Sequence, residues 1–348
     1  MSAQFLIARR PDLSEIWPFV EDRLVARLQA LGEVTVCSAE PGTPVHEVAD
    51  LRDIAGLAWF GGQVGEATIA AAPRLRMIGG VTDNAGFGLP IEQLASREIY
   101  LIDATRAWAQ SVAEVALVLA LSALRRVPRW HGQVAAGEPL WDFPTQQFCD
   151  DADFVNGDLG TKRVGVIGLG QIGRRVAQWC VALGASVVGY DPFLSTELIR
   201  SWDVQPTTMD SLDETAEVIF VLVPPTPSAR HLLSRERIAR LRQGALVVVA
   251  TRAHAVDFAA LRERILRNEL AGAFDVYDIE PLPVDDPLRN RPNVVHTPHI
   301  AGRTRDANLR VADIIADDFA RILQGEQPRA ALRPEQIAVR VARTDLPI

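Results

Sequence analysis

Three glycines in the middle of the chain have a spacing that can serve chemistry. Gly168, Gly170 and Gly173 form the pattern Gly-x-Gly-x-x-Gly directly after an apolar run at residues 164–167. The first glycine of this pattern permits a tight turn, the second lets the backbone approach a ligand, and the third lets a helix pack closely on a strand. The helix N-terminus that follows offers N–H groups and a partial positive charge to phosphates. The pattern therefore predicts a site for the pyrophosphate of a dinucleotide.

An aspartate beyond this helix indicates which dinucleotide would bind. Asp191 follows a second apolar run, at 186–190, and lies 21 residues after Gly170, near the expected spacing of about 20. A carboxylate there accepts hydrogen bonds from the ribose hydroxyls and repels a 2′-phosphate, so the pattern favours NAD over NADP. A similar turn also occurs in glycine-rich loops that bind nothing and in some methyl-donor-binding enzymes.

Polar residues also lie at the ends of three later apolar runs. Arg252, Asp275, Glu280 and His299 each lie at, or shortly after, the end of a predicted strand. Ligands of open α/β sheets bind at the carboxyl ends of the strands. We therefore expect these four side chains to converge on one crevice.

The elements that must position these residues alternate between strands and helices. Apolar runs predict strands at 5–8, 34–37, 57–60, 76–78, 99–102, 164–167, 186–190, 218–223, 246–249, 272–276 and 294–296. This alternation predicts an α/β protein of two domains. Residues 111–305 would form a central Rossmann domain with a doubly wound parallel sheet. It would be inserted in a flavodoxin-like α/β substrate domain made of residues 1–110 and 306–348.

Helical periodicity is clear in three segments, 13–31, 111–126 and 305–323. Ser111 and Glu114 have the spacing of a capping box, and Pro128 is expected to stop the second helix. The following stretch, 127–160, is rich in aromatic residues but has little periodicity. It is predicted to be either a dimerisation arm, which would make the protein a homodimer, or an ordinary packed loop. An apolar patch at 337–341 suggests a final strand.

Composition excludes several classes of partner. The net charge is −8 and the pI is near 5.4, which argues against binding to nucleic acid or to an anionic membrane. Cys37, Cys149 and Cys180 have no metal-ligand spacing, so no metal site is expected. We see no apolar run of the roughly 18 residues that a membrane span needs, and no signal-peptide pattern. The expected location is the cytoplasm.

Five segments taken together resemble the NAD-dependent D-isomer-specific 2-hydroxyacid dehydrogenase family, which includes D-3-phosphoglycerate, glycerate, formate and phosphonate dehydrogenases. The resemblance covers about residues 50–325 and is strongest over 164–304. The matching pieces are the glycine pattern, Pro224-Pro225-Thr226-Pro227, Arg252 after its strand, Asp275-Val276 with Glu280-Pro281-Leu282, and Pro298-His299-Ile300-Ala301-Gly302. The order and spacing agree in all five segments, so the set is highly specific.

This resemblance implies that His299 is the general acid/base, that Glu280 is its partner and that Arg252 anchors a 2-hydroxy or 2-keto acid. Hydride transfer to a 2-keto acid builds negative charge on the carbonyl oxygen, and histidine is the usual proton donor near neutral pH. A carboxylate on the other ring nitrogen stabilises the imidazolium and fixes the ring. A guanidinium can fork onto the substrate carboxylate and polarise the carbonyl.

The resemblance also implies the contacts of NAD and substrate. The cofactor contacts are Gly168, Gly170, Gln171, Ile172 and Gly173 at the pyrophosphate, Asp191 at the ribose, Pro224 and Thr226 on the adenosine side, Ala250, Thr251 and Arg252 near the nicotinamide, Asp275 at its carboxamide, and the backbone of His299, Ala301 and Gly302. The substrate contacts are Val81 and Thr82 through their N–H groups, with Arg252 and His299.

Three departures from the family pattern affect the expected geometry. Val249 stands where the family usually has asparagine, and Ala253 stands where it usually has glycine. The loop at 79–84 also departs from the commoner glycine-containing loop. The first change removes a side-chain hydrogen bond and the second restricts the backbone beside Arg252.

Other functions fit the same motifs. One is a formate or phosphonate dehydrogenase relative, although Glu280 argues against formate because those enzymes are expected to carry glutamine there. Another is an NAD-sensing scaffold like the C-terminal-binding corepressors, which share the fold and the triad. The residues do not name the hydroxy acid, because its side chain would be read by loops near 58–62, 79–88 and 105–110.

Overall fold

The computed structural model describes residues 2–81, 89–138 and 150–332 of the chain. The chain divides into two compact units, a first unit of Met1–Ala109 with Arg303–Ile348 and a second unit of Gln110–Gly302. The boundaries expected from the sequence, after residues 110 and 305, lie one and three residues from these.

The first unit contains a five-stranded sheet in the order β2-β1-β3-β4-β5, in which all strand pairs are parallel. Its strands are β1 (Ala3–Arg9), β2 (Gly32–Ser38), β3 (Gly56–Phe60), β4 (Met77–Gly80) and β5 (Tyr100–Asp103). This is the flavodoxin-like strand order. All five strands were expected from apolar runs, and the predicted α/β fold class is confirmed.

The helices of the first unit cover this sheet. They are α1 (Leu13–Ile16), α2 (Val20–Gln29), α3 (Val45–Val48), α4 (Glu66–Ala71), α6 (Ile91–Ser96) and α14 (Arg305–Leu323), with a 3-10 turn η1 (Ala104–Trp108). The prediction of a single helix over 13–31 is wrong, because the structure has two helices there. Pro18 lacks an N–H group and disfavours a helical conformation at Trp17, and Phe19 takes a left-handed φ of 75°, so the helix is broken there.

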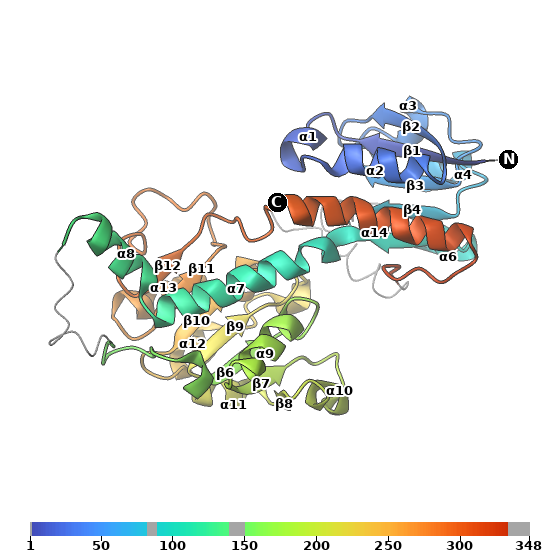
Figure 1. Cartoon of the computed structure of the whole chain (residues 1–348). Helices are drawn as coiled ribbons and strands as arrows, with labels where there is room; N and C mark the ends of the chain where they lie inside the picture. Colours follow the sequence, from blue (N-terminus) through green and yellow to red (C-terminus); the bar gives the residue numbers. More distant parts are fainter. Residues whose placement is uncertain (1, 82–88, 139–149, 333–348) are drawn as a thin grey trace. The chain divides into compact units, whose positions relative to one another are not determined.

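Helix α14 completes the first unit from the far end of the sequence. Its Phe319 stacks on Phe5 of β1 with ring centroids 6.0 Å apart. A Cβ atom at Gly56 would lie 2.8 Å from Phe319, and one at Gly79 would lie 2.7 Å from Ile315, so these glycines admit the helix. Figure 1 shows α14 lying along β4 and α2.

The second unit contains a seven-stranded parallel sheet in the order β12-β11-β10-β9-β6-β7-β8. Its strands are β6 (Arg163–Ile167), β7 (Ser186–Tyr190), β8 (Gln205–Pro206), β9 (Val218–Val221), β10 (Leu246–Val249), β11 (Ala271–Phe274) and β12 (Val294–His296). The order reverses between β6 and β9, as in a doubly wound Rossmann sheet. Only the two-residue β8, which has no apolar run, was not expected.

The helices of the second unit pack on the two faces of this sheet, apart from the one at Val127–Ala135, which has no buried residue. They are α7 (Ala109–Leu124), α8 (Val127–Ala135), α9 (Gly173–Ala182), α10 (Thr196–Arg200), α11 (Met209–Thr215), α12 (Arg235–Arg240) and α13 (Phe258–Leu266), with 3-10 turns η2 (Leu159–Thr161), η3 (Pro227–Ala229) and η4 (Ala253–Ala255). Side chains alternate along each strand. In β10, Val247 and Val249 face the core of α11 to α13, whereas Leu246 and Val248 face the core of α7 and α9.

The helical stretch before α8 differs from the expected one. Helix α7 continues from η1, so Ser111 lies inside it rather than capping it. The capping side chain is Asp103, which accepts a hydrogen bond from the N–H of Thr105. Pro128 lies in the first turn of α8, where its missing N–H is tolerated, so 127–135 is helical rather than irregular.

The continuity of η1 and α7 also bears on the membrane expectation. In the described part of the chain, Ala104–Leu124 is long and apolar enough to cross a membrane by length and composition, with a mean hydropathy of 1.6. The expectation that no segment reaches this length is therefore wrong. Length and composition support a span only weakly, because Ala113, Ala116 and Ala120 are buried in the core of the second unit, as in the core helix of a soluble domain. The patch at 337–341 lies outside the described residues.

Candidate active site

The predicted site residues of the second unit share one edge of its sheet. The parallel register aligns Tyr190, Ile167, Val221, Val249, Phe274 and His296 in a single row across neighbouring strands. The chain leaves each strand at or just beyond this row and enters the loops that carry the predicted residues. The structure thus places the glycine turn, Asp191, Arg252, Asp275 and His299 along the same carboxyl edge.

The glycine turn is shaped for close approach. Gly168 has a φ of +87°, and a Cβ atom at Gly173 would lie 1.8 Å from the carbonyl oxygen of Gly168. By contrast, nothing lies within 4 Å of a Cβ placed on Gly170. Among the described residues, none accepts a hydrogen bond from the N–H of Gly170, Gln171 or Ile172. These donors precede α9 and fit the pyrophosphate of a dinucleotide.

Asp191 is tied to that turn. Its Oδ2 accepts a hydrogen bond from the N–H of Leu169 at 2.9 Å, and its Oδ1 accepts one from the N–H of Phe193 at 3.0 Å. Each carboxylate oxygen retains a further lone pair. The side chain is therefore fixed beside the glycine turn with acceptor capacity left for ribose hydroxyls.

The loops after β9 and β10 contribute the remaining residues predicted for the adenosine and nicotinamide. Thr226 is buried, and its N–H donates to the carbonyl oxygen of Pro224 at 2.8 Å. Thr251 donates its hydroxyl to the carbonyl oxygen of Val223 at 3.2 Å, which ties these two loops together. Ala250, directly before Thr251, is buried.

His299 and Glu280 form a close polar pair at this edge. Nδ1 of His299 lies 2.6 Å from Oε2 of Glu280, while Oε1 of Glu280 accepts a hydrogen bond from the N–H of Tyr277 at 2.9 Å. The two side chains are 37% and 35% exposed, so a small molecule can reach them. Among the described residues, none bonds to Nε2 of His299. That nitrogen is therefore available to exchange a proton with a ligand.

The backbone at His299 is held in an uncommon conformation. Its φ is +53°, a left-handed value that only a few per cent of residues other than glycine adopt, although histidine, asparagine and aspartate adopt it more often than the rest. Asp275 stabilises this turn, because its fully buried carboxylate accepts hydrogen bonds from the N–H groups of Ile300 and Ala301 and from the hydroxyl of Thr297. With three of about four acceptor positions used, Asp275 mainly orders the loop of His299.

Arg252 projects into solvent at the end of β10. Its Nη1 donates to its neighbour's carbonyl oxygen, that of Thr251, at 2.9 Å, and no carboxylate in the described residues pairs with it. Ala253 begins η4 without a positive φ, so no glycine is required there. Val249 is fully buried in the core at the strand end. The guanidinium is available to an anionic ligand despite both departures from the family pattern.

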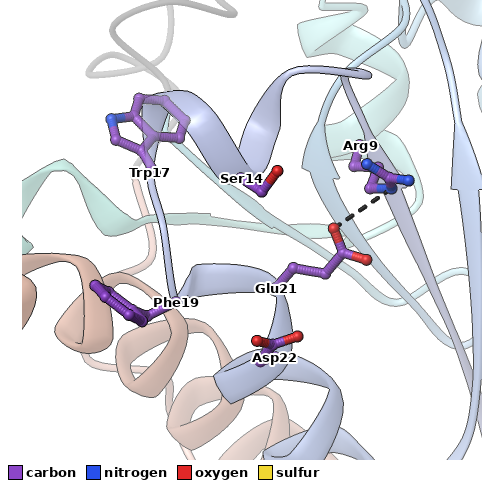
Figure 2. A pocket seen from close by; sticks show the side chains of 6 residues that line it. All are labelled: Arg9, Ser14, Trp17, Phe19, Glu21 and Asp22. Carbon is purple, nitrogen blue, oxygen red and sulfur yellow. Dashed lines mark ion pairs between the residues drawn. The ribbon is translucent and has the colours of Figure 1, made fainter.

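The two residues predicted to bind substrate through the backbone belong to the first unit. Val81 is buried directly after β4, and Thr82 lies outside the described residues. Figure 2 shows a hollow at the end of β1 in the same unit, where Trp17 and Phe19 lie near the ion pair of Arg9 and Glu21, whose Nε and Oε2 atoms are 3.4 Å apart. The sequence offered no prediction for this hollow.

Sequence reasoning did not identify the residues that hold the loop of Glu280 beside His299. The loop that carries Glu280 is held by three hydrogen bonds of 3.0 Å. They join Tyr277 to His296, His296 to the carbonyl oxygen of Leu288, and Arg262 to Asp286. No local pattern marks them, because these side-chain hydrogen bonds join positions that are 8 to 24 residues apart in the sequence. In the described part of the chain, no group of three or more His, Cys, Asp or Glu side chains is arranged to hold a metal.

The glycine turn yields a prediction with a built-in comparison. Gly173→Ala should destabilise the protein by roughly 1–3 kcal/mol and lower its Tm by several degrees, because the new methyl group overlaps the Gly168 carbonyl. Gly170→Ala should leave the Tm unchanged but weaken NADH binding, since its methyl group would occupy open space beside the turn. Thermal unfolding and NADH fluorescence titration measure both. Equal Tm values for Gly173→Ala and the wild type would contradict this account of the turn.

Comparison with known proteins places the chain in a family. Residues 117–301 match the model of the D-isomer specific 2-hydroxyacid dehydrogenase, NAD binding domain. The chain is 36% identical over 274 residues to D-3-phosphoglycerate dehydrogenase of Archaeoglobus fulgidus, covering 78% of this chain but 49% of that protein. It therefore spans about half the length of that relative.

A second relative is matched over nearly its whole length. Glyoxylate/hydroxypyruvate reductase B of Pectobacterium carotovorum is 30% identical over 319 residues, which are 91% of this chain and 96% of that protein. Among solved structures, a phosphoglycerate oxidoreductase from Rhizobium etli has the same fold, with a TM-score of 0.81 at 23% identity over 95% of this chain and 98% of that one. The chain belongs to the D-isomer specific 2-hydroxyacid dehydrogenase family.

Proposed function

We propose that the protein is an NAD-dependent oxidoreductase that interconverts a D-2-hydroxy acid and its 2-keto acid. The observation that carries this proposal is the 2.6 Å contact between His299 and Glu280 on the sheet edge that also bears the glycine turn and Asp191. An acid/base pair and a dinucleotide-binding turn on one edge are the two components that such a reaction requires.

The roles proposed for the side chains are those that the family resemblance implies, and the 2.6 Å contact between His299 and Glu280 supports them. A dinucleotide held at the glycine turn and Asp191 would supply the hydride that reduces the carbonyl carbon of the substrate. Nε2 of His299 delivers a proton to the carbonyl oxygen, while Glu280 stabilises the positive charge of the imidazolium through Nδ1 and keeps the ring oriented. Arg252 forks onto the substrate carboxylate and draws charge from the carbonyl. Oxidation reverses these steps.

The choice of NAD is supported by Asp191. Its carboxylate is held beside the glycine turn by two backbone N–H groups, so it cannot swing away from a ribose bound there. A 2′-phosphate would meet this fixed negative charge. We therefore propose NAD rather than NADP as the cofactor.

We propose an unphosphorylated 2-keto acid as the substrate. The relative matched over 96% of its length is named a glyoxylate/hydroxypyruvate reductase, whereas the chain matches only 49% of the phosphoglycerate dehydrogenase. The N-terminal residues also contain no basic cluster that would mark a phosphate subsite.

The experiment that tests the function is oxidation of NADH against a panel of 2-keto acids, with NADPH in parallel. The panel runs from glyoxylate, pyruvate and hydroxypyruvate to branched and aromatic acids. Turnover with NADH supports the proposal. Tight NADH binding without turnover of any acid would favour the NAD-sensing scaffold, and turnover of formate or phosphonate would favour those relatives. A preference for NADPH would overturn the role of Asp191.

We also propose that the protein is a homodimer. Apolar residues of α7 and α8 are exposed, with Val118, Val127 and Val134 at 58%, 51% and 50%. Helix α8 begins the segment 127–160, which the sequence suggested as a dimerisation arm, and α7 ends just before it. Sedimentation equilibrium at micromolar concentration should give twice the chain mass of 38.1 kDa, and a monomer would contradict the proposal.

A further inference from the structure

Glu280 lies in a long loop without regular structure, between β11 and β12. Two side chains from outside this loop each connect its beginning to its end. His296 of β12 bonds to Tyr277 through Nδ1 and to the carbonyl oxygen of Leu288 through Nε2, both at 3.0 Å. Arg262 of α13 bonds to Asp278 at 2.9 Å and to Asp286 at 3.0 Å. Both side chains therefore bridge the two ends of the segment 277–288, and each bridge closes it into a loop.

The donors and acceptors in the two hydrogen bonds of His296 can be assigned. Burial lowers the pKa of His296, which favours the neutral ring. The Leu288 carbonyl can only accept, so the ring proton lies on Nε2 and Nδ1 is an acceptor. Nδ1 is then the nearest of three acceptors around the Tyr277 hydroxyl, at 3.0 Å, since the carbonyl oxygens of Phe274 and Thr297 each lie at 3.2 Å. Burial also raises the pKa of Tyr277, so its hydroxyl keeps that proton.

Tyr277 connects this closure to both members of the catalytic pair. Its N–H donates to Oε1 of Glu280, whose other oxygen contacts His299. Its ring is buried, and its hydroxyl lies 3.2 Å from the carbonyl oxygen of Thr297, at the start of the loop that carries His299. A shift of the tyrosine would therefore move Glu280 relative to the imidazole.

We propose that Tyr277 and His296 are positioning residues, which hold Glu280 against His299 by closing the segment 277–288. This inference rests on the proposed function, because it assigns a purpose to the orientation of a proton-transferring histidine. Neither residue is assigned a contact with the substrate, because the Tyr277 ring is buried and both ring nitrogens of His296 are used by Tyr277 and Leu288. Misplacing a catalytic group by about 1 Å can cost 10²-fold in rate, so even a small displacement of Glu280 would be measurable.

The test removes only the Tyr277 hydroxyl. Tyr277→Phe should lower kcat roughly five- to tenfold, as expected for the loss of one neutral hydrogen bond that acts on the transition state. KM for the keto acid and Kd for NADH should stay within about twofold of the wild-type values. Tyr100→Phe, which removes a hydroxyl from β5 of the first unit, is the matched control and should behave like the wild type.

A double-mutant cycle separates positioning from general destabilisation. In a Glu280→Gln background, Tyr277→Phe should cause little further loss of kcat, because its effect passes through Glu280. His296→Asn, which keeps an acceptor for the tyrosine but cannot reach Leu288, provides a second variant and should also lower kcat without raising KM. NADH titration checks that each variant is folded.

The outcomes distinguish this inference from the proposed function. If Glu280→Gln and His299→Ala retain full activity, the proposed function itself fails. If those two variants lose activity while Tyr277→Phe matches Tyr100→Phe, the positioning role is wrong. An equal loss from Tyr277→Phe with and without Glu280 would likewise overturn it, because the tyrosine would then act independently of the carboxylate.

Discussion

Replacement of His299 with alanine should lower kcat/KM about 10²- to 10⁴-fold, the range usually lost with a general acid/base. The reason is that Nε2 of His299 is the proton donor that we assign to the carbonyl oxygen, and its other nitrogen is already held by Glu280. NADH affinity should change little, because the loop backbone is anchored separately by Asp275. Steady-state kinetics with the best keto acid and NADH fluorescence measure the two effects.

Two further variants make the His299 result specific. Alanine is strained at a φ of +53°, whereas asparagine tolerates the left-handed region, so His299→Asn removes the titrating ring with less backbone strain. Both variants should lose the same activity. His131→Ala, at an exposed position of α8, should remain fully active. A loss below tenfold in His299→Asn would show that another group transfers the proton.

Replacement of Arg252 with alanine should lower kcat/KM roughly 10²- to 10⁴-fold, mainly through a higher KM. A forked guanidinium–carboxylate contact comprises two charge-assisted hydrogen bonds, and each is worth about 1.5–3 kcal/mol. Arg252 is exposed and has no carboxylate partner in the part of the chain that the structure describes, so its removal should not disturb the fold. Kinetics across the keto-acid panel and a Tm measurement test both statements.

The Arg252 series also discriminates geometry from charge. Arg252→Lys keeps the positive charge but lacks the planar fork, so it should recover only part of the activity. Arg200→Ala removes an exposed arginine from α10 of the same unit and should have no effect. If Arg252→Ala and Arg200→Ala had equal kcat/KM values, the anchor would have to be sought elsewhere.

The strand edge was predictable from sequence, because its signals are local. Apolar runs mark the strands, the glycine spacing marks the first turn, and polar residues such as Arg252 and His299 closely follow strand ends. Parallel register then brings these ends into one row without further information. The fold class and the family could be predicted from these local patterns.

The remaining features depend on contacts that no local pattern encodes. The break at Pro18 and Phe19 overrides a helical periodicity that spans both sides of it. Asp275 was expected to bind a carboxamide, yet the fold directs its carboxylate onto the amides of the His299 loop. The closure by His296 joins residues that precede and follow Glu280, and only the folded sheet edge brings them together.

The place of α14 in the sequence has a consequence for synthesis. The first unit draws its core from the N-terminal strands and from Phe319 and Ile315, which the ribosome makes after the whole second unit. Until then, Phe5 and the faces of Gly56 and Gly79 have no partner helix. During translation the second unit can fold first. The first unit cannot complete its core until α14 is made, so its apolar surface stays exposed until then. The apolar faces of the N-terminal strands that pack on α14 therefore stay uncovered until the end of the described chain has been made.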